Sequence, residues 1–231
     1  MVFKKSLKFD EKAIIKTMNL DFKQIKLGFF EVNNISSSED LSKLASSIGQ
    51  IIPHPNGEKI YTLSPNTGED AIKGTLSNRF GLSEFPLHSD TAFWSQPSRY
   101  IVMGMIKESS CDTQLISWNE IFSVLSPQAK NYAKNASYII DTIDEKKYTS
   151  LFFSNNGERG LRFDPCCMKP VNKAAKKFND EMVIIQQNLK PKKIIWSGKK
   201  AVVIDNWQYL HGRSTVSAHD KKRKLLRIYI R

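Results

Sequence analysis

The 231-residue sequence has no long apolar run and no repeated or low-complexity segment. Its unbroken apolar stretches, such as residues 201–204, are far shorter than the roughly 20 residues that a membrane-spanning helix needs. The basic start of the chain, with Lys4, Lys5 and Lys8, is not followed by an apolar block of signal-peptide length. We therefore expect a cytoplasmic protein that has no membrane partner.

Cysteine is scarce, and its spacing is uninformative for metal binding. The chain has Cys111, Cys166 and Cys167, which are odd in number and include two neighbours, and it has no C-x-x-C motif. This pattern argues against both a disulfide framework and a cysteine zinc site. We expect buried, reduced thiols.

Acidic residues are too few to balance the basic ones, and the formal net charge is +12. A basic surface attracts anionic partners over long distances, so nucleic acid and an anionic small molecule are both candidates. The lysines are spread along the chain, with the densest cluster at residues 221–224, as is typical of a solvated face. Because we find no RNP-type aromatic strand, zinc-finger spacing or recognition helix, nucleic-acid binding is the alternative and not the main prediction.

No Pro/Gly/Ser-rich linker divides the chain, so we predict one domain over residues 1–231. Apolar residues at helical spacing predict helices that begin near Ser38, Ser117 and Val171, the second breaking near Pro127 and the third ending before Pro191. Many short segments read as strands instead. These segments are residues 59–63, 85–93, 99–106, 138–142, 150–153, 193–196, 201–210 and 225–230. Without regular strand–helix alternation, they predict a sandwich or barrel with helices packed outside.

The most informative histidine lies in the segment Phe-Pro-Leu-His-Ser-Asp at residues 85–90. On a strand, His88 and Asp90 would point to the same side. A further histidine from a distant strand would complete a 2-His-1-carboxylate set, which leaves open coordination positions in non-haem iron(II) oxygenases. Alone, the H-x-D pair is a weak signal, because a histidine on a strand is usually a hydrogen-bonded structural residue.

Near the C-terminus, an apolar strand leads into His211 and Gly212, and the glycine can close a tight turn. Arg223 follows twelve residues after His211, and Arg227 lies on the next apolar strand. If these strands form a hairpin, Arg223 returns towards His211. An arginine there could hold a dicarboxylate, because its planar fork matches a carboxylate. The alternative is a charged outer face of the strand.

Together these segments resemble the taurine dioxygenase and clavaminate synthase-like superfamily of Fe(II)/2-oxoglutarate oxygenases. The matching segments, in the family's order, are residues 86–90, 112–113, 205–213 and 223–227. The resemblance implies a mainly β fold with flanking helices, namely a double-stranded β-helix or distorted jelly roll. It also implies that His88, Asp90 and His211 bind Fe(II).

The same resemblance implies that Arg223 binds the distal carboxylate of 2-oxoglutarate, with the Thr113 hydroxyl as a helper, and that Arg227 lies near the co-substrate or the primary substrate. Dioxygen would be the second co-substrate, and succinate and CO2 would be released. The carboxylate at Asp90 favours hydroxylation, desaturation or cyclisation of an unactivated C–H bond over halogenation. Hydrogen bonds to the metal-binding histidines should set their tautomers, with Asp205 or Asn206 as possible partners.

The primary substrate is not identified by any motif. Polar side chains that we consider for its binding are Asn78, Arg79, Arg162 and Arg213, although an ordinary surface turn or a structural ion pair explains them equally well. Since Arg227 can lack a partner on 2-oxoglutarate, we expect a small anionic or amino-acid-like substrate, either free or carrier-tethered. A catalytically inactive scaffold on the same fold is a further alternative, which the complete ligand set argues against. The oligomeric state is not indicated.

Overall fold

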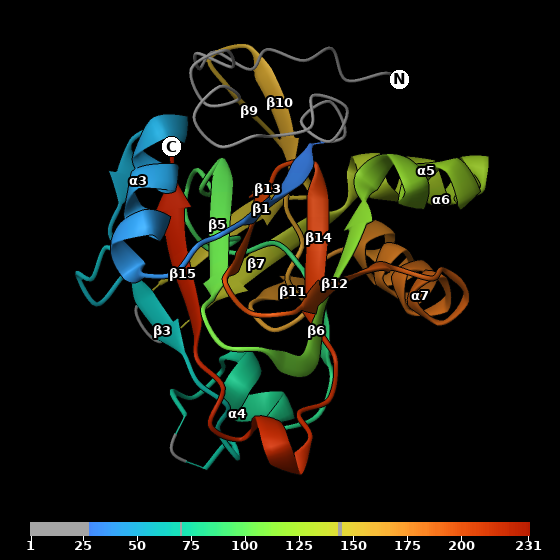
Figure 1. Cartoon of the computed structure of the whole chain (residues 1–231). Helices are drawn as coiled ribbons and strands as arrows, with labels where there is room; N and C mark the ends of the chain where they lie inside the picture. The colour runs from blue at the N-terminus through green and yellow to red at the C-terminus, as the bar shows by residue number, and fades with distance from the viewer. Residues whose placement is uncertain (1–27, 70, 143–144) are drawn as a thin grey trace.

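A computed structural model describes residues 28–69, 71–142 and 145–231 (Figure 1). Its largest sheet is antiparallel, has six strands and runs in the order β1-β13-β5-β15-β2, with β3 also paired to β15. The strands are β1 (Phe29–Asn33), β2 (Ile51–Ile52), β3 (Tyr61–Leu63), β5 (Tyr100–Met105), β13 (Lys200–Asp205) and β15 (Leu225–Ile230). Neighbours in the sheet are far apart in the sequence, so its register depends on long-range pairing.

A four-stranded antiparallel sheet contributes the rest of the sandwich, in the order β12-β6-β14-β4. Its strands are β4 (Phe85–His88), β6 (Ser109–Ser117), β12 (Lys192–Trp196) and β14 (Tyr209–Arg213). One buried cluster joins the two sheets: Met103 and Ile204 from the larger sheet pack with Leu115 and Ile194 from the smaller one. The fold is thus mainly β, and the two facing sheets form the double-stranded β-helix that was expected.

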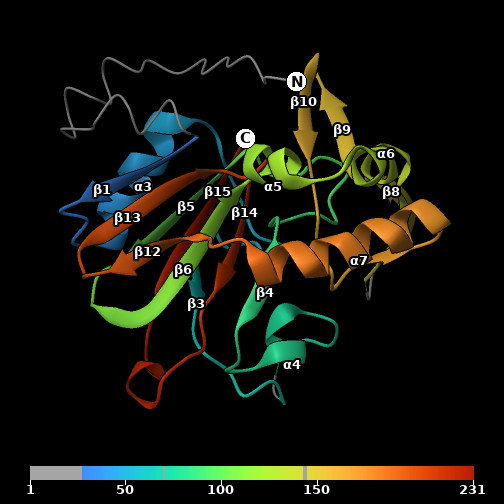
Figure 2. The ribbon, with the colours of Figure 1, turned by 90° about the vertical axis from the view of Figure 1, so that its right-hand side faces the viewer.

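Smaller elements complete the β structure. A three-stranded sheet contains β7 (Ser137–Asp141), β8 (Lys146–Ser150) and β11 (Met168–Pro170), and a hairpin contains β9 (Phe152–Asn155) and β10 (Glu158–Leu161). The helices are α3 (Ser38–Ile48), α4 (Leu76–Phe80), α5 (Trp118–Val124), α6 (Pro127–Asn135), α7 (Lys173–Asn188) and the 3-10 turn η1 (Ala218–Asp220). Figure 1 shows α3 on one side of the sheets and α5, α6 and α7 on the other; Figure 2 shows α7 along its length.

Helix α3 illustrates how local signals determine an element. The Ser37 side chain accepts a hydrogen bond from the backbone of Asp40, whose carboxylate accepts from the backbone of Ser37 in return. Leu41 and Leu44 on its apolar face pack against the six-stranded sheet. The predicted helix is confirmed, with Ser37 and not Ser38 as the cap.

Several predicted boundaries are wrong. The predicted strand 201–210 is split into β13 and β14 by a turn, in which the backbone N–H of Gln208 donates to the carbonyl of Asp205. The predicted strand 85–93 ends at His88. The predicted strand 150–153 is interrupted between β8 and β9. Pro127 begins the unpredicted helix α6, where the missing N–H of proline costs nothing.

No helix in the described ranges is both long and apolar enough to cross a membrane. The cytoplasmic location expected from the sequence stays a prediction. The three cysteines are free and buried, as expected.

Candidate metal centre

The two histidines of the proposed ligand set lie on neighbouring strands of the four-stranded sheet. Strand β14 pairs with β4 in antiparallel register, and His211 is directly opposite His88. Their ring centroids are 4.4 Å apart, and each residue is only 4% exposed. Residues directly opposite in an antiparallel pair project to the same face, so the register itself brings both imidazoles together.

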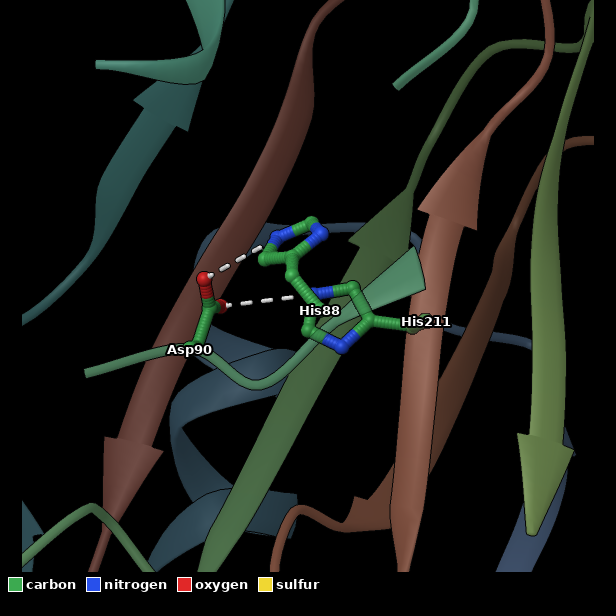
Figure 3. A group of neighbouring side chains, drawn as sticks. All are labelled: His88, Asp90 and His211. Carbon is green, nitrogen blue, oxygen red and sulfur yellow. Dashed lines mark ion pairs between the residues drawn. The ribbon is translucent and has the colours of Figure 1, made fainter. Parts of the chain in front are cut away.

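Asp90 approaches the two imidazoles from beyond the end of β4 (Figure 3). Its Oδ1 is 3.7 Å from Nε2 of His88, and its Oδ2 is 3.7 Å from Nε2 of His211. These distances are too long for direct N–H···O hydrogen bonds. One ligand atom from each of the three residues lies within 4.8 Å of the others. Two imidazoles and one carboxylate that face a common point form a 2-His-1-carboxylate arrangement.

Arg227 on β15 is the main cation beside Asp90. Its Nη1 donates to both carboxylate oxygens at 2.9 Å. Burial alone would raise the pKa of Asp90, but Arg227 and the two imidazoles outweigh burial and hold that pKa well below its usual range. The carboxylate is therefore ionised in this environment and able to ligate a cation.

The two imidazoles differ in their electrostatic surroundings. Burial, and then the neighbouring His88, lower the pKa of His211 to about 3, which leaves this ring neutral at pH 7. Burial also disfavours protonated His88, but the adjacent Asp90 outweighs it and raises the pKa of His88 above the ordinary value. A neutral imidazole is the form that binds a metal.

Hydrogen bonding at Nδ1 also differs between the two rings. Nδ1 of His88 is 2.9 Å from the carbonyl oxygen of Pro86, so Nδ1 carries a proton and Nε2 is the ring nitrogen that faces Asp90. Nδ1 of His211 is buried and has no hydrogen-bond partner among the described residues. The expected partner is present for His88, where it is Pro86 and not Asp205 or Asn206, and for His211 none is found among the described residues.

Aromatic rings that were not predicted surround Arg227. The guanidinium lies 4.8 Å from the ring centroid of Tyr229 and 5.8 Å from that of Tyr61. The His54 ring stacks on both tyrosines, and its Nε2 is 3.2 Å from the carbonyl oxygen of Arg227. Tyr229 follows Arg227 at the strand spacing of two, which was an available signal. His54 and Tyr61 lie far from Arg227 in the sequence, so no local pattern could predict that they pack around it.

Of the residues predicted to hold 2-oxoglutarate, Thr113 lies on strand β6 and Arg223 contacts that strand. Arg223 precedes β15 instead of lying on it, and its Nη1 donates to the carbonyl of Cys111 at 2.9 Å. Thr113 is two residues further along β6, is buried, and accepts a hydrogen bond from Nε1 of Trp196 at 3.1 Å. Strand β6 pairs directly with β14, which carries His211. This places Arg223 and Thr113 near one strand beside the histidines; their roles stay predictions.

Two of the four candidate substrate residues are held by backbone carbonyls. Arg162 is buried and donates to the carbonyls of residues 92, 94 and 95. Arg213 donates to the carbonyls of Gly81 and Ser83, and its guanidinium lies 3.6 Å from the ring centroid of Phe85. These contacts occupy both guanidinium groups with the fold itself, although their predicted role in substrate binding is not tested by them.

The other two candidates lie on the short helix α4. The Asn78 amide accepts from the N–H of Gly74 and donates to the carbonyl of Gly68, which ties together the preceding loop. Arg79 is exposed, with Nη1 3.5 Å from the carbonyl oxygen of Pro165. Their role in substrate binding likewise stays a prediction.

Gly212 has a different role from the one expected. It lies within β14 and not in a turn. A Cβ added to it would lie 2.7 Å from the carbonyl oxygen of Phe85 on β4, so only glycine permits this close approach of the two strands. The residue next to His211 therefore sets the distance between the strands that carry the two histidines.

The chain has the fold of Fe(II)/2-oxoglutarate oxygenases of the taurine dioxygenase and clavaminate synthase-like type. No protein-family model matches the sequence, and a search of curated proteins finds no match either. Among solved structures, the non-haem iron oxygenase OrfP in complex with Fe, succinate and (3S)-hydroxy-L-Arg is similar, with a TM-score of 0.70 and 15% identity over 95% of this chain and 81% of that chain.

Two further structures share the fold. PvcB from Pseudomonas aeruginosa has a TM-score of 0.67 and 15% identity, over 89% of this chain and 76% of PvcB. Asparagine oxygenase in complex with Fe(II), (2S,3S)-3-hydroxyasparagine and succinate has a TM-score of 0.65 and 14% identity over 79% of this chain. The match covers only 59% of the asparagine oxygenase chain. At such identities the likeness establishes the fold, and function has to be argued from the residues of this chain.

Proposed function

We propose that the protein is a non-haem Fe(II)- and 2-oxoglutarate-dependent oxygenase that also uses dioxygen. The observation that carries this proposal is the convergence of His88, Asp90 and His211, all buried and facing one another, within this fold. An exposed acidic cluster would carry little weight, because such clusters are common without a metal. Two buried imidazoles and one ionised carboxylate that face one another form a donor set that suits iron(II).

The protonation states of the three side chains fit a metal ion. The Nδ1 proton of His88 faces Pro86, so Nε2 is the nitrogen that would ligate, and a metal would displace any proton on it. His211 is neutral at pH 7, and Asp90 is ionised. These three residues would hold the metal. When bound, iron(II) supplies positions for 2-oxoglutarate and dioxygen, and the redox chemistry that couples decarboxylation of the co-substrate to oxidation of a C–H bond.

The remaining residues bind and orient. Arg223 and Thr113 would hold the distal carboxylate of 2-oxoglutarate, the arginine through its planar pair of donors. Their position beside β6 supports this assignment, since β6 is the direct neighbour of the strand that carries His211. The products would be succinate, CO2 and an oxidised substrate. The outcome would be hydroxylation, desaturation or cyclisation.

For the primary substrate we favour an amino-acid-like molecule with a carboxylate. Arg227 supports this choice, because its buried Nε has no hydrogen-bond partner in the described part of the chain and remains available to an anionic group. Tyr61 and Tyr229 flank the guanidinium and would keep water from it. The structures of OrfP and asparagine oxygenase hold hydroxylated arginine and asparagine respectively, which is consistent with this substrate class.

The test is an anaerobic titration of the protein with Fe(II) and 2-oxoglutarate, followed by the weak visible metal-to-ligand charge-transfer band. We expect the band in the wild-type protein, its loss in His88→Ala and its weakening in Arg223→Ala. His219→Ala is the matched control, because it removes an exposed histidine from the η1 turn. A well-folded wild-type protein that gives no band would refute the proposal.

A further inference from the structure

Asp90 is not positioned by the strand register that brings the two histidines together. Strand β4 ends at His88, and the residue after Asp90, Thr91, has a left-handed backbone with φ of 54°. A residue outside a ladder needs other contacts to fix its backbone. The placement of the carboxylate therefore depends on whatever holds the segment after His88.

The side chain of Asn206 makes that contact. Its Oδ1 accepts from the backbone N–H of Asp90 at 3.0 Å, and its Nδ2 donates to the carbonyl of Asp90 at 2.9 Å. The same Nδ2 donates to the carbonyl of Ser98 at 3.0 Å, at the other end of the segment. Asn206 is 0% exposed. The side-chain amide of Asn206 thus binds both the backbone N–H and the backbone carbonyl of Asp90. It also connects Asp90 to Ser98, at the far end of the loop.

Asn206 itself lies on a rigid support. It belongs to the turn between β13 and β14, five residues before His211. Its backbone N–H donates to the carbonyl of Arg99 at 2.9 Å. The preceding Asp205 accepts from the backbone N–H of Trp207 and from Nη2 of Arg99. The turn that leads into the His211 strand is therefore also the support for Asp90, although the two ligands are far apart in the sequence.

We propose that Asn206 is a positioning residue that holds Asp90 in the metal-binding geometry. This inference rests on the proposed function, because it concerns the same metal ion. Asn206 acts on the peptide groups of residue 90, whereas Arg227 acts on its carboxylate. Removing the amide leaves the buried N–H of Asp90 and the buried carbonyl of Ser98 without partners, and it leaves the carbonyl of Asp90 with the Thr91 hydroxyl alone. The segment must therefore move to find new partners. Loss of such supporting contacts typically lowers metal affinity about 10- to 100-fold.

The test compares Fe(II) affinity of the full chain, measured by anaerobic calorimetric titration without 2-oxoglutarate. We expect Asn206→Ala to bind Fe(II) about 10- to 100-fold more weakly than the wild-type protein. Asn172→Ala is the matched control. Asn172 also makes three hydrogen bonds to backbone groups, those of Ala175, Ser137 and Asn135, but it caps α7, away from the ligands.

We expect Asn172→Ala to lower the melting temperature and to keep the wild-type Fe(II) affinity. If Asn206→Ala binds Fe(II) as tightly as the wild-type protein, the positioning role is refuted and the proposed function stands. If the wild-type protein itself binds no Fe(II), both are refuted. Should Asn206→Ala be too unstable to titrate, Asn206→Ser is judged by the same criterion, because its hydroxyl can replace only part of the amide contacts.

Discussion

Arg227 donates from a single nitrogen, Nη1, to both carboxylate oxygens of Asp90, at 2.9 Å each. The side chains are 16% and 8% exposed, so both charges are largely removed from water. The same carboxylate faces His88 and His211. The candidate metal ligand Asp90 is therefore ionised without a metal. Asp90 and Arg227 also depend strongly on each other, because removal of either leaves a buried charge unpaired.

The Arg227–Asp90 pair should show strong energetic coupling in the absence of metal. Because each single substitution leaves a buried charge unpaired, we expect Asp90→Asn and Arg227→Met each to lower the free energy of unfolding by about 3 kcal/mol. The double variant should lose clearly less than the sum. Urea unfolding in the presence of EDTA measures all four proteins.

The exposed pair Lys177–Asp180 on α7 is the control for this cycle. Its atoms are 3.7 Å apart, and its side chains are 53% and 68% exposed. A double-mutant cycle with Lys177→Met and Asp180→Asn should give a coupling of at most about 0.5 kcal/mol. Additive losses at Arg227 and Asp90 would contradict the structural assignment.

Gly212→Ala should disturb both stability and metal binding. The new Cβ would meet the backbone carbonyl oxygen of Phe85 at 2.7 Å, so β4 must move away from β14 and carry His88 away from His211. We expect a loss of about 1–3 kcal/mol in the free energy of unfolding. The rise in melting temperature on adding Fe(II) should become smaller.

Gly104→Ala serves as the comparison for Gly212→Ala. A Cβ added to Gly104 would lie 2.6 Å from the side chain of Leu41, which belongs to helix α3. This variant should be destabilised while keeping its metal-induced rise in melting temperature. An equal effect of both variants on metal binding would show that the spacing of β4 and β14 is not critical.

His54 should remain uncharged well into the acidic range. Burial, and then the charge of Arg227, lower the pKa of His54 to about 4. Because this folded-state pKa is below the ordinary 6.5, the contribution of His54 to stability is complete above pH 6.5 and is lost as pH falls towards 4. With allowance for solvent screening, we expect a loss of about 1–2 kcal/mol that His54→Gln lacks.

The measurement for His54 is the imidazole proton shift in NMR, together with urea unfolding between pH 7 and pH 5. The shift should stay at its neutral value at pH 5.5. A titration midpoint near 6.5 would contradict the buried, stacked environment of this ring.

The three thiols should be unreactive in the native protein. Cys111, Cys166 and Cys167 are all buried, and burial raises the pKa of Cys166 to about 11 and that of Cys167 well above its usual range. Since the thiolate is the reactive form, labelling with Ellman's reagent at pH 8 should be slow in the native state and reach three thiols after unfolding. Ser123→Cys, on the exposed face of α5, should label at once. Fast labelling of the wild-type native protein would contradict the burial.

Elements with strong local signals were predictable, and elements with mixed ones were not. Helix α3 and strand β15 agree with the predictions, because α3 has apolar residues at helical spacing and β15 is a nearly continuous apolar run. Strand β6 was missed, since the side chains that it buries include Ser109, Thr113 and Ser117 as well as apolar ones. Buried and more exposed residues alternate along most of β6, but apolar and polar residues do not, so the sequence shows no strand pattern there.

The candidate ligands were identified from several weak motifs in one order, which the resemblance made jointly specific. The expected pairing of His88 and Asp90 on one strand face was only half the explanation. His88 is on the strand, but Asp90 lies beyond its end and is held by Asn206. A spacing of two residues predicted the pair without revealing what positions its second member.

By itself, the amino-acid sequence indicated the candidate metal ligands, the strand-rich character of the chain and the buried state of the cysteines. The candidate ligands follow from motifs and their order together with the family resemblance, and the other two properties follow from composition and local patterns. Only the tertiary structure decided that His211 lies opposite His88, that Arg227 neutralises Asp90 and that Asn206 holds the backbone of Asp90. Each of these contacts joins segments more than a hundred residues apart. They depend on strand register and on the burial of polar groups that must find partners, and no local pattern encodes either.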